Sequence, residues 1–278
     1  MSSRFAEPWL SRRPYQDFHP RLVEALRQQA RFPEPEVYAE LAKRVPQAPG
    51  SELPRFVTES REAVAEQGGY EAHVARLRSV PTRPGHFHDF FNMTVWAHFP
   101  QVRWALNALH VARETTERDP RNGRTPAQNR AASFDESGLV VVSTSRAILE
   151  ELRALRFKAA FWERRDELLE STRFWVVGHG LLESLLTPHA RLSARSVLLH
   201  VPTLPAGCDD DAFRFGLDAR LARRIAGWPA RPELFDPLPL LAIPGYTDND
   251  SAAFYEDARN LVFDPVSRRP AAGAASFE

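Results

Sequence analysis

Cysteine and lysine are nearly missing from this sequence. Cys208 is the single cysteine among 278 residues, so no intramolecular disulfide can form. A lone thiol is typical of a reducing compartment and excludes the class of small secreted proteins that depend on disulfides. Of the 36 lysines and arginines, only Lys43 and Lys158 are lysines, a bias from which we infer nothing about function. The low cysteine content therefore favours a cytoplasmic protein.

Long apolar runs and an excess of charge are also missing. No stretch approaches the roughly 18 consecutive apolar residues of a transmembrane helix, and the first twenty residues hold no apolar run of the roughly 7 to 15 residues found in a signal peptide. The 36 basic residues match 36 acidic ones, so no net field draws the chain toward nucleic acid or anionic lipid. We expect neither a membrane nor nucleic acid as a partner, and the sequence is silent on oligomeric state.

Several well-known catalytic motifs are absent from the sequence as well. It contains no G-x-S-x-G, no G-x-x-x-x-G-K-[ST], no G-x-G-x-x-G and no C-x-x-C. A serine hydrolase elbow, a P-loop, a Rossmann fingerprint and a zinc ribbon therefore have no support. Cys208 precedes the acidic run Asp209–Asp211, which disfavours a thiolate, so we do not expect a nucleophilic cysteine.

The sequence does contain enough apolar material for a large core. Hydrophobic residues make up 43% of the chain and charged residues 26%, and there are 18 phenylalanines and 6 tryptophans. Apolar residues recur at helical spacing along most of the chain, whereas the strand-like runs are short and include Leu139–Val142, Phe174–Val177 and Val197–Val201. We therefore predict an α+β fold, a helix-dominated single domain around a small sheet.

The distribution of proline suggests how the chain is divided. Eight of the 23 prolines lie in the first 55 residues and cut this part into short helical pieces. We predict a proline-rich helical N-terminal extension over residues 1–69, which wraps the core, a main α+β domain over residues 70–265 and a disordered tail over residues 266–278. The arginine-rich stretch Arg113–Arg130 carries turn signals and is predicted to be a long loop.

The first group of candidate site residues lies at the start of a helix predicted near residue 89. Asp89 is placed to cap this helix, while His88 and Asn92, four residues apart, project from the same region. His88 is a candidate metal ligand or general acid, and Asn92 a candidate hydrogen-bond donor to a substrate. The alternative interpretation is that Asp89 is a helix cap and nothing more.

The second candidate is the pair Asp135 and Glu136. These residues precede Ser137-Gly138 between two strand-like runs, an arrangement that predicts a β-hairpin. Neighbouring residues on a strand point to opposite faces, so either Asp135 or Glu136, but not both, would face a pocket and bind substrate. The alternative is that both residues serve only the hairpin turn.

The third candidate is His179, which stands between Gly178 and Gly180 after an apolar strand. Glu183 follows four residues later, so the two side chains share one face of the predicted helix. His179 would be a metal ligand or a general base, and Glu183 a further ligand or the group that orients the imidazole. The alternative is a buried, hydrogen-bonded histidine with a structural role.

Six segments together resemble a known family. They are Val80–Arg83, His88–Asn92, Val95–Pro100, Ala105–His110, Phe134–Gly138 and Gly178–Glu183. Over roughly residues 70–260 the chain resembles a proteobacterial family catalogued as domain of unknown function 3025. The resemblance implies a bacterial, cytoplasmic protein and no particular reaction. It supports the candidate residues named above as positions to test, and Arg83, at the end of the first segment, is added as a binding residue.

These observations lead to one leading hypothesis about function and one main alternative, and nucleic-acid binding through Arg113–Arg130 ranks last. We predict an enzyme, most simply a hydrolase of a small polar substrate, whose catalytic residues meet across a cleft: His88, Asp89, Asn92, His179 and Glu183. Two imidazoles and a carboxylate, from His88, His179 and Glu183, could hold a divalent metal and lower the pKa of its bound water. The alternative is a non-catalytic binding protein in which these residues are caps and buried pairs and the arginine-rich stretch docks an acidic partner.

Overall fold

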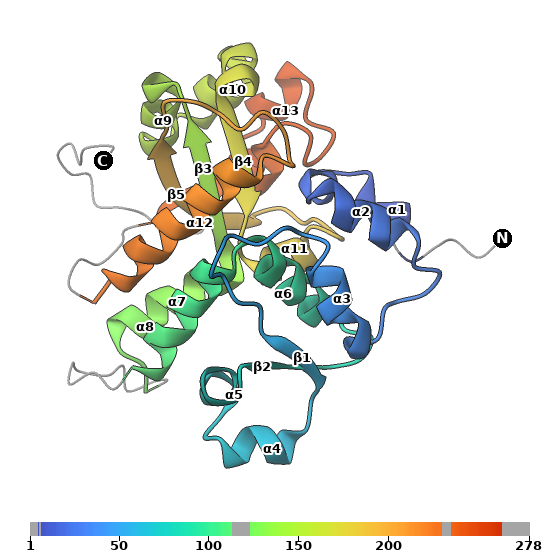
Figure 1. Cartoon of the computed structure of the whole chain (residues 1–278). Helices are drawn as coiled ribbons and strands as arrows, with labels where there is room; N and C mark the ends of the chain where they lie inside the picture. Colours follow the sequence, from blue (N-terminus) through green and yellow to red (C-terminus); the bar gives the residue numbers. More distant parts are fainter. Residues whose placement is uncertain (1–4, 6, 113–122, 230–234, 263–278) are drawn as a thin grey trace. The chain divides into compact units, whose positions relative to one another are not determined.

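The computed structural model describes residue 5 and residues 7–112, 123–229 and 235–262 (Figure 1). Helices dominate, and the strands form one two-stranded and one four-stranded sheet, so the predicted helix-dominated α+β class is confirmed. Across these described ranges, every helix is too short or too polar to cross a bilayer.

Contacts divide the chain into two compact units, each assembled from separate stretches of sequence. Unit 1 consists of residues 1–11, 16–135 and 206–233, and unit 2 of residues 12–15, 136–205 and 234–278. The sequence-based boundary after residue 69 stays a prediction. The tail predicted to be disordered, residues 266–278, lies outside the described residues.

Unit 1 consists of helices and a small parallel sheet. Its elements are α1 (Glu7–Leu10), α2 (Pro20–Arg27), η2 (Pro35–Val37), α3 (Tyr38–Ala42), β1 (Arg55–Thr58), α4 (Arg61–Glu66), α5 (Tyr70–Leu77), β2 (Ser79–Thr82), α6 (Phe87–His98), α7 (Pro100–Val111), most of α8 (Pro126–Ser137) and α12 (Asp211–Ala226). A 3-10 turn, η1 (Tyr15–Asp17), contains the boundary between the units. Strands β1 and β2 pair in parallel, with Arg55 opposite Ser79. They were not predicted, because four residues are too few to show a strand period.

Helix α6 is a central element of the unit 1 core. Every residue from Asp89 to His98 is buried, including the large side chains of Phe90, Phe91 and Trp96. A helix that is apolar on most sides is stable only when other elements cover it on those sides. Pro100 separates α6 from α7, since proline cannot continue a helix but suits the first helical position.

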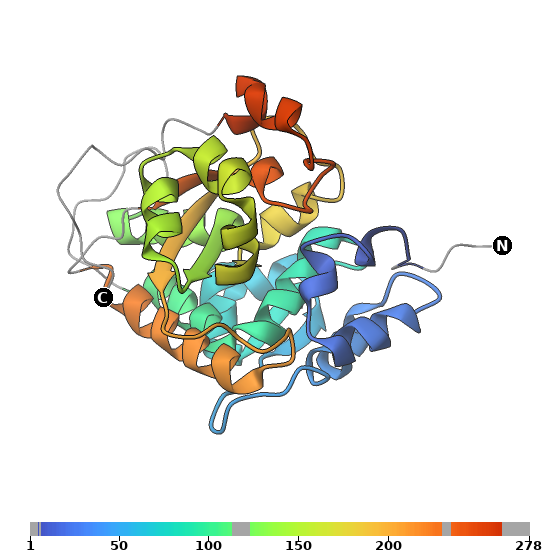
Figure 2. The same cartoon turned by 90° about the horizontal axis from the view of Figure 1, so that it is seen from above.

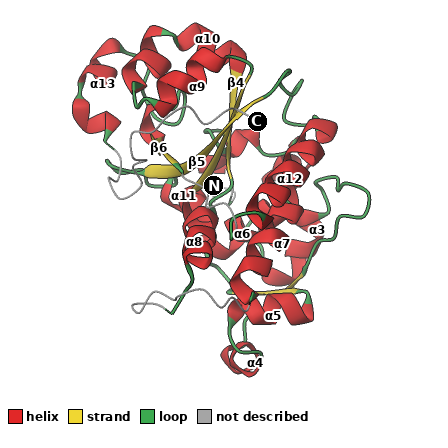
Figure 3. Ribbon diagram, turned by 90° about the vertical axis from the view of Figure 1, so that its left-hand side faces the viewer, coloured by secondary structure: helices red, strands yellow, loops and turns green. Residues whose placement is uncertain are grey.

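The N-terminus of α7 is capped by a side chain of α12. Asp218 accepts hydrogen bonds from the amide of Gln101 at 3.1 Å and from the amide of Val102 at 2.9 Å. Burial raises the pKa of Asp218 to about 6, although these two amides favour the ionised carboxylate. The cap ties α12 to α7, and the two helices lie beside each other in Figures 1 and 3.

Residues 126–137 form helix α8, so the prediction of a hairpin at this place is wrong. The side chain of Thr125 accepts a hydrogen bond from the Gln128 amide at 3.2 Å, and the Gln128 side chain accepts one from the Thr125 amide at 2.9 Å. This reciprocal arrangement is a capping box, and Pro126 suits the first position of the helix. Helix α8 also takes up the end of the arginine-rich stretch that we predicted to be a loop, whose residues 113–122 lie outside the described part.

Unit 2 is organised around a four-stranded mixed sheet. Its elements are the end of α8, β3 (Gly138–Ser143), α9 (Arg146–Arg153), η3 (Ala159–Glu163), α10 (Arg165–Ser171), β4 (Thr172–Val176), α11 (His179–Ser184), β5 (Ser193–His200), β6 (Asp236–Pro239), η4 (Leu240–Ala242), α13 (Ala252–Glu256) and η5 (Ala258–Leu261). The strand order is β4-β3-β5-β6, in which β3 and β5 are parallel and the two outer strands are antiparallel to their neighbours. The three strand-like runs of the sequence fall on β3, β4 and β5, so these predictions are confirmed.

Strand β3 is at the centre of the unit 2 core. All six of its residues are buried, and Val140 lies opposite Trp175 of β4 and Val197 of β5. Helix α9 packs against β3, β5 and β6, and α10 packs against β4, as Figures 2 and 3 show. A strand that is paired on both edges and covered by helices can be apolar at every position, which explains the continuous run Leu139–Val142.

Candidate functional site

A buried histidine and a half-exposed glutamate lie close together in unit 2. His179 is the first residue of α11, directly after the turn that follows β4, and it is 5% exposed. Glu136 lies in the last turn of α8, and its side chain is 52% exposed. The Nε2 atom of His179 lies 3.6 Å from Oε1 of Glu136. The pair thus combines an imidazole in the protein interior with a carboxylate that solvent reaches.

Two glycines allow the turn before α11 to lie directly on Glu136. A methyl group at Gly178 would come within 2.6 Å of the Glu136 carbonyl oxygen and closer still to the amide nitrogen of Gly138. A methyl group at Gly180 would lie 3.0 Å from the same carbonyl oxygen and would overlap the Glu136 carboxylate. Close approach, not an unusual backbone angle, is therefore the reason for glycine on both sides of His179.

We expect Gly180→Ala to displace the Glu136 carboxylate while the fold stays intact. The added methyl group meets the end of a side chain that can rotate away. The better helix propensity of alanine, worth about 1 kcal/mol, offsets part of an overpacking cost of about 1 to 3 kcal/mol. A crystal structure of the variant measures the distance between Glu136 and His179, and an unchanged contact of 3.6 Å would contradict this prediction.

Glu183, the predicted partner of His179, lies one turn further along α11, so the two residues share a helix as expected. The carboxylate 3.6 Å from the imidazole, however, belongs to Glu136. The sequence suggested Glu136 only as an alternative to Asp135 for binding substrate. Spacing along the chain cannot pair His179 with a residue so distant in sequence, because the pairing depends on where α8 ends beside β4.

Asp89 is not the helix cap that we predicted. Helix α6 begins at Phe87, which places Asp89 in the first turn. Its carboxylate accepts hydrogen bonds from the amide of Arg83 at 2.6 Å and from the guanidinium of Arg83 at 2.8 and 2.9 Å. Burial raises the pKa of Asp89, but the hydrogen bonds and the charge of Arg83 outweigh burial and hold the pKa below its usual value. Arg83 and Asp89 therefore neutralise each other as an ion pair.

Asn92 belongs to a chain of polar side chains in the interior of unit 1. Its amide nitrogen donates to the hydroxyl of Tyr70 at 2.9 Å, and its amide oxygen accepts from Arg103 at 2.9 Å. Arg103 also forms an ion pair with Asp135, and it is only 5% exposed. Asp135 is helical, so the prediction that it alternates with Glu136 across the faces of a strand is wrong.

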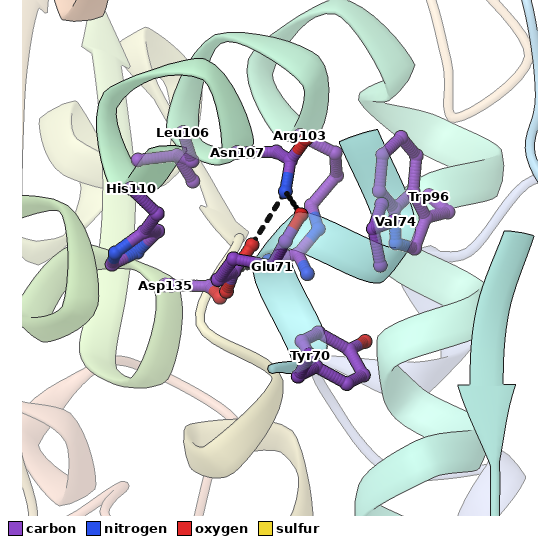
Figure 4. A pocket seen from close by; sticks show the side chains of 9 residues that line it. All are labelled: Tyr70, Glu71, Val74, Trp96, Arg103, Leu106, Asn107, His110 and Asp135. Carbon is purple, nitrogen blue, oxygen red and sulfur yellow. Dashed lines mark hydrogen bonds and ion pairs between the residues drawn. The ribbon is translucent and has the colours of Figure 1, made fainter. Parts of the chain in front are cut away.

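This polar chain borders a narrow pocket in unit 1, seen in Figure 4. The residues that line it are Tyr70, Glu71 and Val74 of α5, Trp96 of α6, Arg103, Leu106, Asn107 and His110 of α7, and Asp135 of α8. Asn107 donates to the side chain of Glu71 at 2.6 Å and to its carbonyl oxygen at 2.9 Å. Burial lowers the pKa of His110, so this imidazole is neutral near pH 7. The pocket therefore has mixed polar and aromatic walls without one dominant charge.

Three residues that line the pocket were not predicted from the sequence: Arg103, Asn107 and His110. They stand at i, i+4 and i+7 along α7, a spacing that places them on one face of the helix. A polar stripe on an otherwise apolar helix was the signal that could have found them. Of the predicted residues, Asp135 lines this pocket and Asn92 binds its arginine.

The predicted site residues are distributed over both units. Unit 1 contains Arg83, His88, Asp89, Asn92 and Asp135, and unit 2 contains Glu136, His179 and Glu183. Within unit 1 the structure pairs Arg83 with Asp89 and connects Asn92 to Asp135 through Arg103, and within unit 2 it brings Glu136 to His179. His88 is a half-buried residue of the first turn of α6. A site shared by His88 and His179 would involve both units and stays a prediction.

Comparison with known proteins identifies a family and no reaction. Residues 54–266 match the model of a family described as a protein of unknown function, DUF3025. Neither a curated protein nor a solved structure matches the chain. The matched range contains Glu136, His179 and all the residues that line the unit 1 pocket. Because this range is well over half of the sequence, the chain belongs to the DUF3025 family.

Proposed function

We propose that this protein is an enzyme that hydrolyses a small polar substrate with the help of a divalent metal ion, and that Glu136 and His179 are ligands of this ion. The family description contains no reaction, so the proposal rests on the chemistry of these two residues. An imidazole nitrogen and a carboxylate oxygen form a donor set that suits zinc, manganese and iron.

The separation of the two side chains is the observation that carries the proposal. A direct hydrogen bond would bring the ring nitrogen and the carboxylate oxygen to about 2.7 to 3.2 Å. Two ligand atoms that bind one zinc ion at about 2.0 to 2.2 Å in tetrahedral geometry lie about 3.3 to 3.6 Å apart. The 3.6 Å between His179 Nε2 and Glu136 Oε1 agrees better with a shared ion than with a direct bond. The exposure of Glu136 leaves water and substrate a route to such an ion.

The chemistry of the proposed reaction follows from these ligands. A zinc ion held by Glu136 and His179 would lower the pKa of a water molecule bound to it and so favour attack of water on the substrate near neutral pH. Glu183, on the same helix as His179, stays the sequence-predicted candidate for a further ligand within unit 2. The proposal also includes a cytoplasmic location in a bacterium. The single cysteine supports the cytoplasmic location, and the family resemblance supports the bacterial origin.

Metal binding tests the proposal directly. We expect the purified protein to bind one equivalent of zinc, manganese or iron, measured by elemental analysis after dialysis. Free metal at 100 times Kd should raise the free energy of unfolding by about 2.7 kcal/mol, which a thermal melt detects. Glu136→Gln and His179→Ala should each abolish this shift, because each removes a ligand.

His189 provides a matched control for the metal experiment, since it is an exposed histidine of the same unit. His189→Ala should bind metal and melt like the unaltered protein. If the protein contains no bound metal and its melting temperature does not change when zinc, manganese or iron is added, the proposal of a metal-assisted reaction is wrong. An equal loss of binding in His189→Ala would mean that the metal binds non-specifically.

A non-catalytic binding protein is the second candidate function, and one observation favours it. The charged residues Arg83, Asp89 and Asp135, predicted for the site in unit 1, are engaged in ion pairs. Arg83 pairs with Asp89, and Asp135 pairs with Arg103, as expected of residues that stabilise a fold. Stability distinguishes the two functions. His179→Ala should cost a few kcal/mol of unfolding free energy if His179 is a structural residue, whereas removal of a site residue usually leaves stability unchanged or improves it.

A further inference from the structure

We propose that Arg103 is a positioning residue that holds Glu136 in place through Asp135. The inference rests on the proposed function, in which Glu136 is a metal ligand. It gives a role to a buried arginine that the sequence did not single out and that would touch neither metal nor substrate.

Arg103 is held in a fixed position by its neighbours in unit 1. It donates to Asn92 at 2.9 Å, and Asn92 is itself bonded to Tyr70 at 2.9 Å. The guanidinium carbon lies 5.2 Å from the ring centre of Trp96. With 5% exposure and a planar, always charged head group, Arg103 presents a rigid cation to Asp135. Figure 4 shows both residues at the pocket, Arg103 on α7 and Asp135 at the end of α8.

Asp135 is the residue directly before Glu136, and both lie in the last turn of α8, which ends at Ser137. Two carboxylates are unfavourable at this place, because the C-terminus of a helix carries partial negative charge and its last carbonyl groups have no partner within the helix. The guanidinium of Arg103 beside Asp135 offsets this repulsion. Without it, we expect the last turn of α8 to fray and Glu136 to lose its fixed position.

A buried ion pair can also serve stability alone, so the test must separate the two roles. Arg214 is the matched control, because it is equally buried and forms an ion pair with Asp211 at 2.6 Å within α12. Arg103→Gln and Arg214→Gln should each destabilise the protein, since each removes a buried guanidinium and its hydrogen bond to a buried partner, Asn92 for Arg103 and the His98 carbonyl for Arg214. The double substitution Arg103→Met with Asp135→Leu removes both charges together and should keep the protein folded.

Two measurements on the full-length chain decide between the roles. The first is zinc affinity, by competition with a chromophoric chelator. The second is amide hydrogen exchange at residues 136–138 in metal-free protein. In Arg103→Gln, which keeps Asp135, we expect a loss of zinc affinity of about ten-fold or more and a similar acceleration of exchange. The double variant, which removes the repelling carboxylate together with its cation, and Arg214→Gln should change neither.

The outcomes separate the positioning role from the proposed function. Unchanged exchange at residues 136–138 in Arg103→Gln would overturn the inference, whether or not zinc binds. Faster exchange with undiminished zinc affinity would overturn it as well, because Glu136 would then bind metal without being positioned. Faster exchange in a protein that binds no zinc would overturn the proposed function and leave Arg103 as the residue that fixes the last turn of α8.

Discussion

Gly178→Ala is expected to lower the free energy of unfolding by about 3 kcal/mol or more. The new methyl group would lie 2.6 Å from the carbonyl oxygen of Glu136 and closer still to the amide nitrogen of Gly138. Both are backbone atoms at the junction of α8 and β3, and the amide of Gly178 donates to the Gly138 carbonyl at 2.8 Å. Overpacking an interior costs about 1 to 3 kcal/mol, and more where backbone must shift.

Gly216→Ala is the control for this prediction. Gly216 is exposed within α12, and a methyl group there would have no atom within 4 Å. The substitution should therefore stabilise the protein by about 0.5 to 1 kcal/mol, the difference in helix propensity between glycine and alanine. Urea denaturation measures both variants. If Gly178→Ala were as stable as the unaltered protein, the turn before α11 would not lie on Glu136 as described.

Acid is expected to destabilise the protein through His98, a buried residue at the end of α6. The Nε2 atom of His98 accepts a hydrogen bond from the His19 amide at 2.9 Å, so the proton of the neutral ring is on Nδ1, which donates to the Thr94 carbonyl at 2.7 Å. Protonation would place a second N–H against the His19 amide. Burial, the largest effect, lowers the pKa of His98 to about 3, compared with about 6.5 in the unfolded chain.

The sign of the pH effect follows from the lowered pKa. Between about pH 6.5 and 3 the unfolded chain binds a proton that the folded protein does not. The contribution of neutral His98 to the free energy of unfolding is therefore fully present above pH 6.5 and is lost as the pH falls. The slope from this one group is about 1.4 kcal/mol per pH unit, which amounts to about 5 kcal/mol over the whole range. His19, whose pKa is also lowered by burial, acts in the same direction.

Comparison with His98→Gln isolates this contribution. Asp218 acts in the opposite direction: its pKa is raised to about 6, so its contribution to stability is largest at low pH and is lost as the pH rises through 6. Because Asp218 is present in both proteins, its effect cancels in the difference between them. Urea denaturation from about pH 7.5 to 4 measures the two slopes. Equal slopes would mean that His98 takes up its proton in the folded state as readily as in the unfolded chain.

The fold class and the strands of unit 2 could be predicted because they depend on local patterns. Continuous apolar runs of strand length identified β3, β4 and β5, and the helical spacing of apolar residues showed that helices dominate. The hairpin at residues 131–142 was wrong because Asp135-Glu-Ser-Gly138 resembles a turn, while the capping box of Thr125 and Gln128 specifies a helix through the same residues. The capping box was visible in the sequence, but Thr125 and the following Pro126 also suit a turn.

The candidate site could be predicted only in part. The Gly-His-Gly turn and the residues Asp135 and Glu136 were found, because glycines beside a polar residue at the end of a strand are a local signal. The Glu136 carboxylate beside His179 and the ion pair of Arg103 with Asp135 were not predicted. Both depend on contacts between residues far apart in the chain, for which no spacing rule exists.

The amino-acid sequence by itself determined the α+β class, the central strands, the glycine-flanked histidine and the resemblance to DUF3025. These follow from periodicity, turn chemistry and short motifs, each contained in a few consecutive residues. Only the tertiary structure decided that Glu136 lies beside His179 and that Arg83 forms an ion pair with Asp89. It also decided that Arg103 binds both Asn92 and Asp135. The reason is physical: a buried charge must find an opposite charge or a hydrogen-bond partner, and which residue supplies it depends on packing in three dimensions.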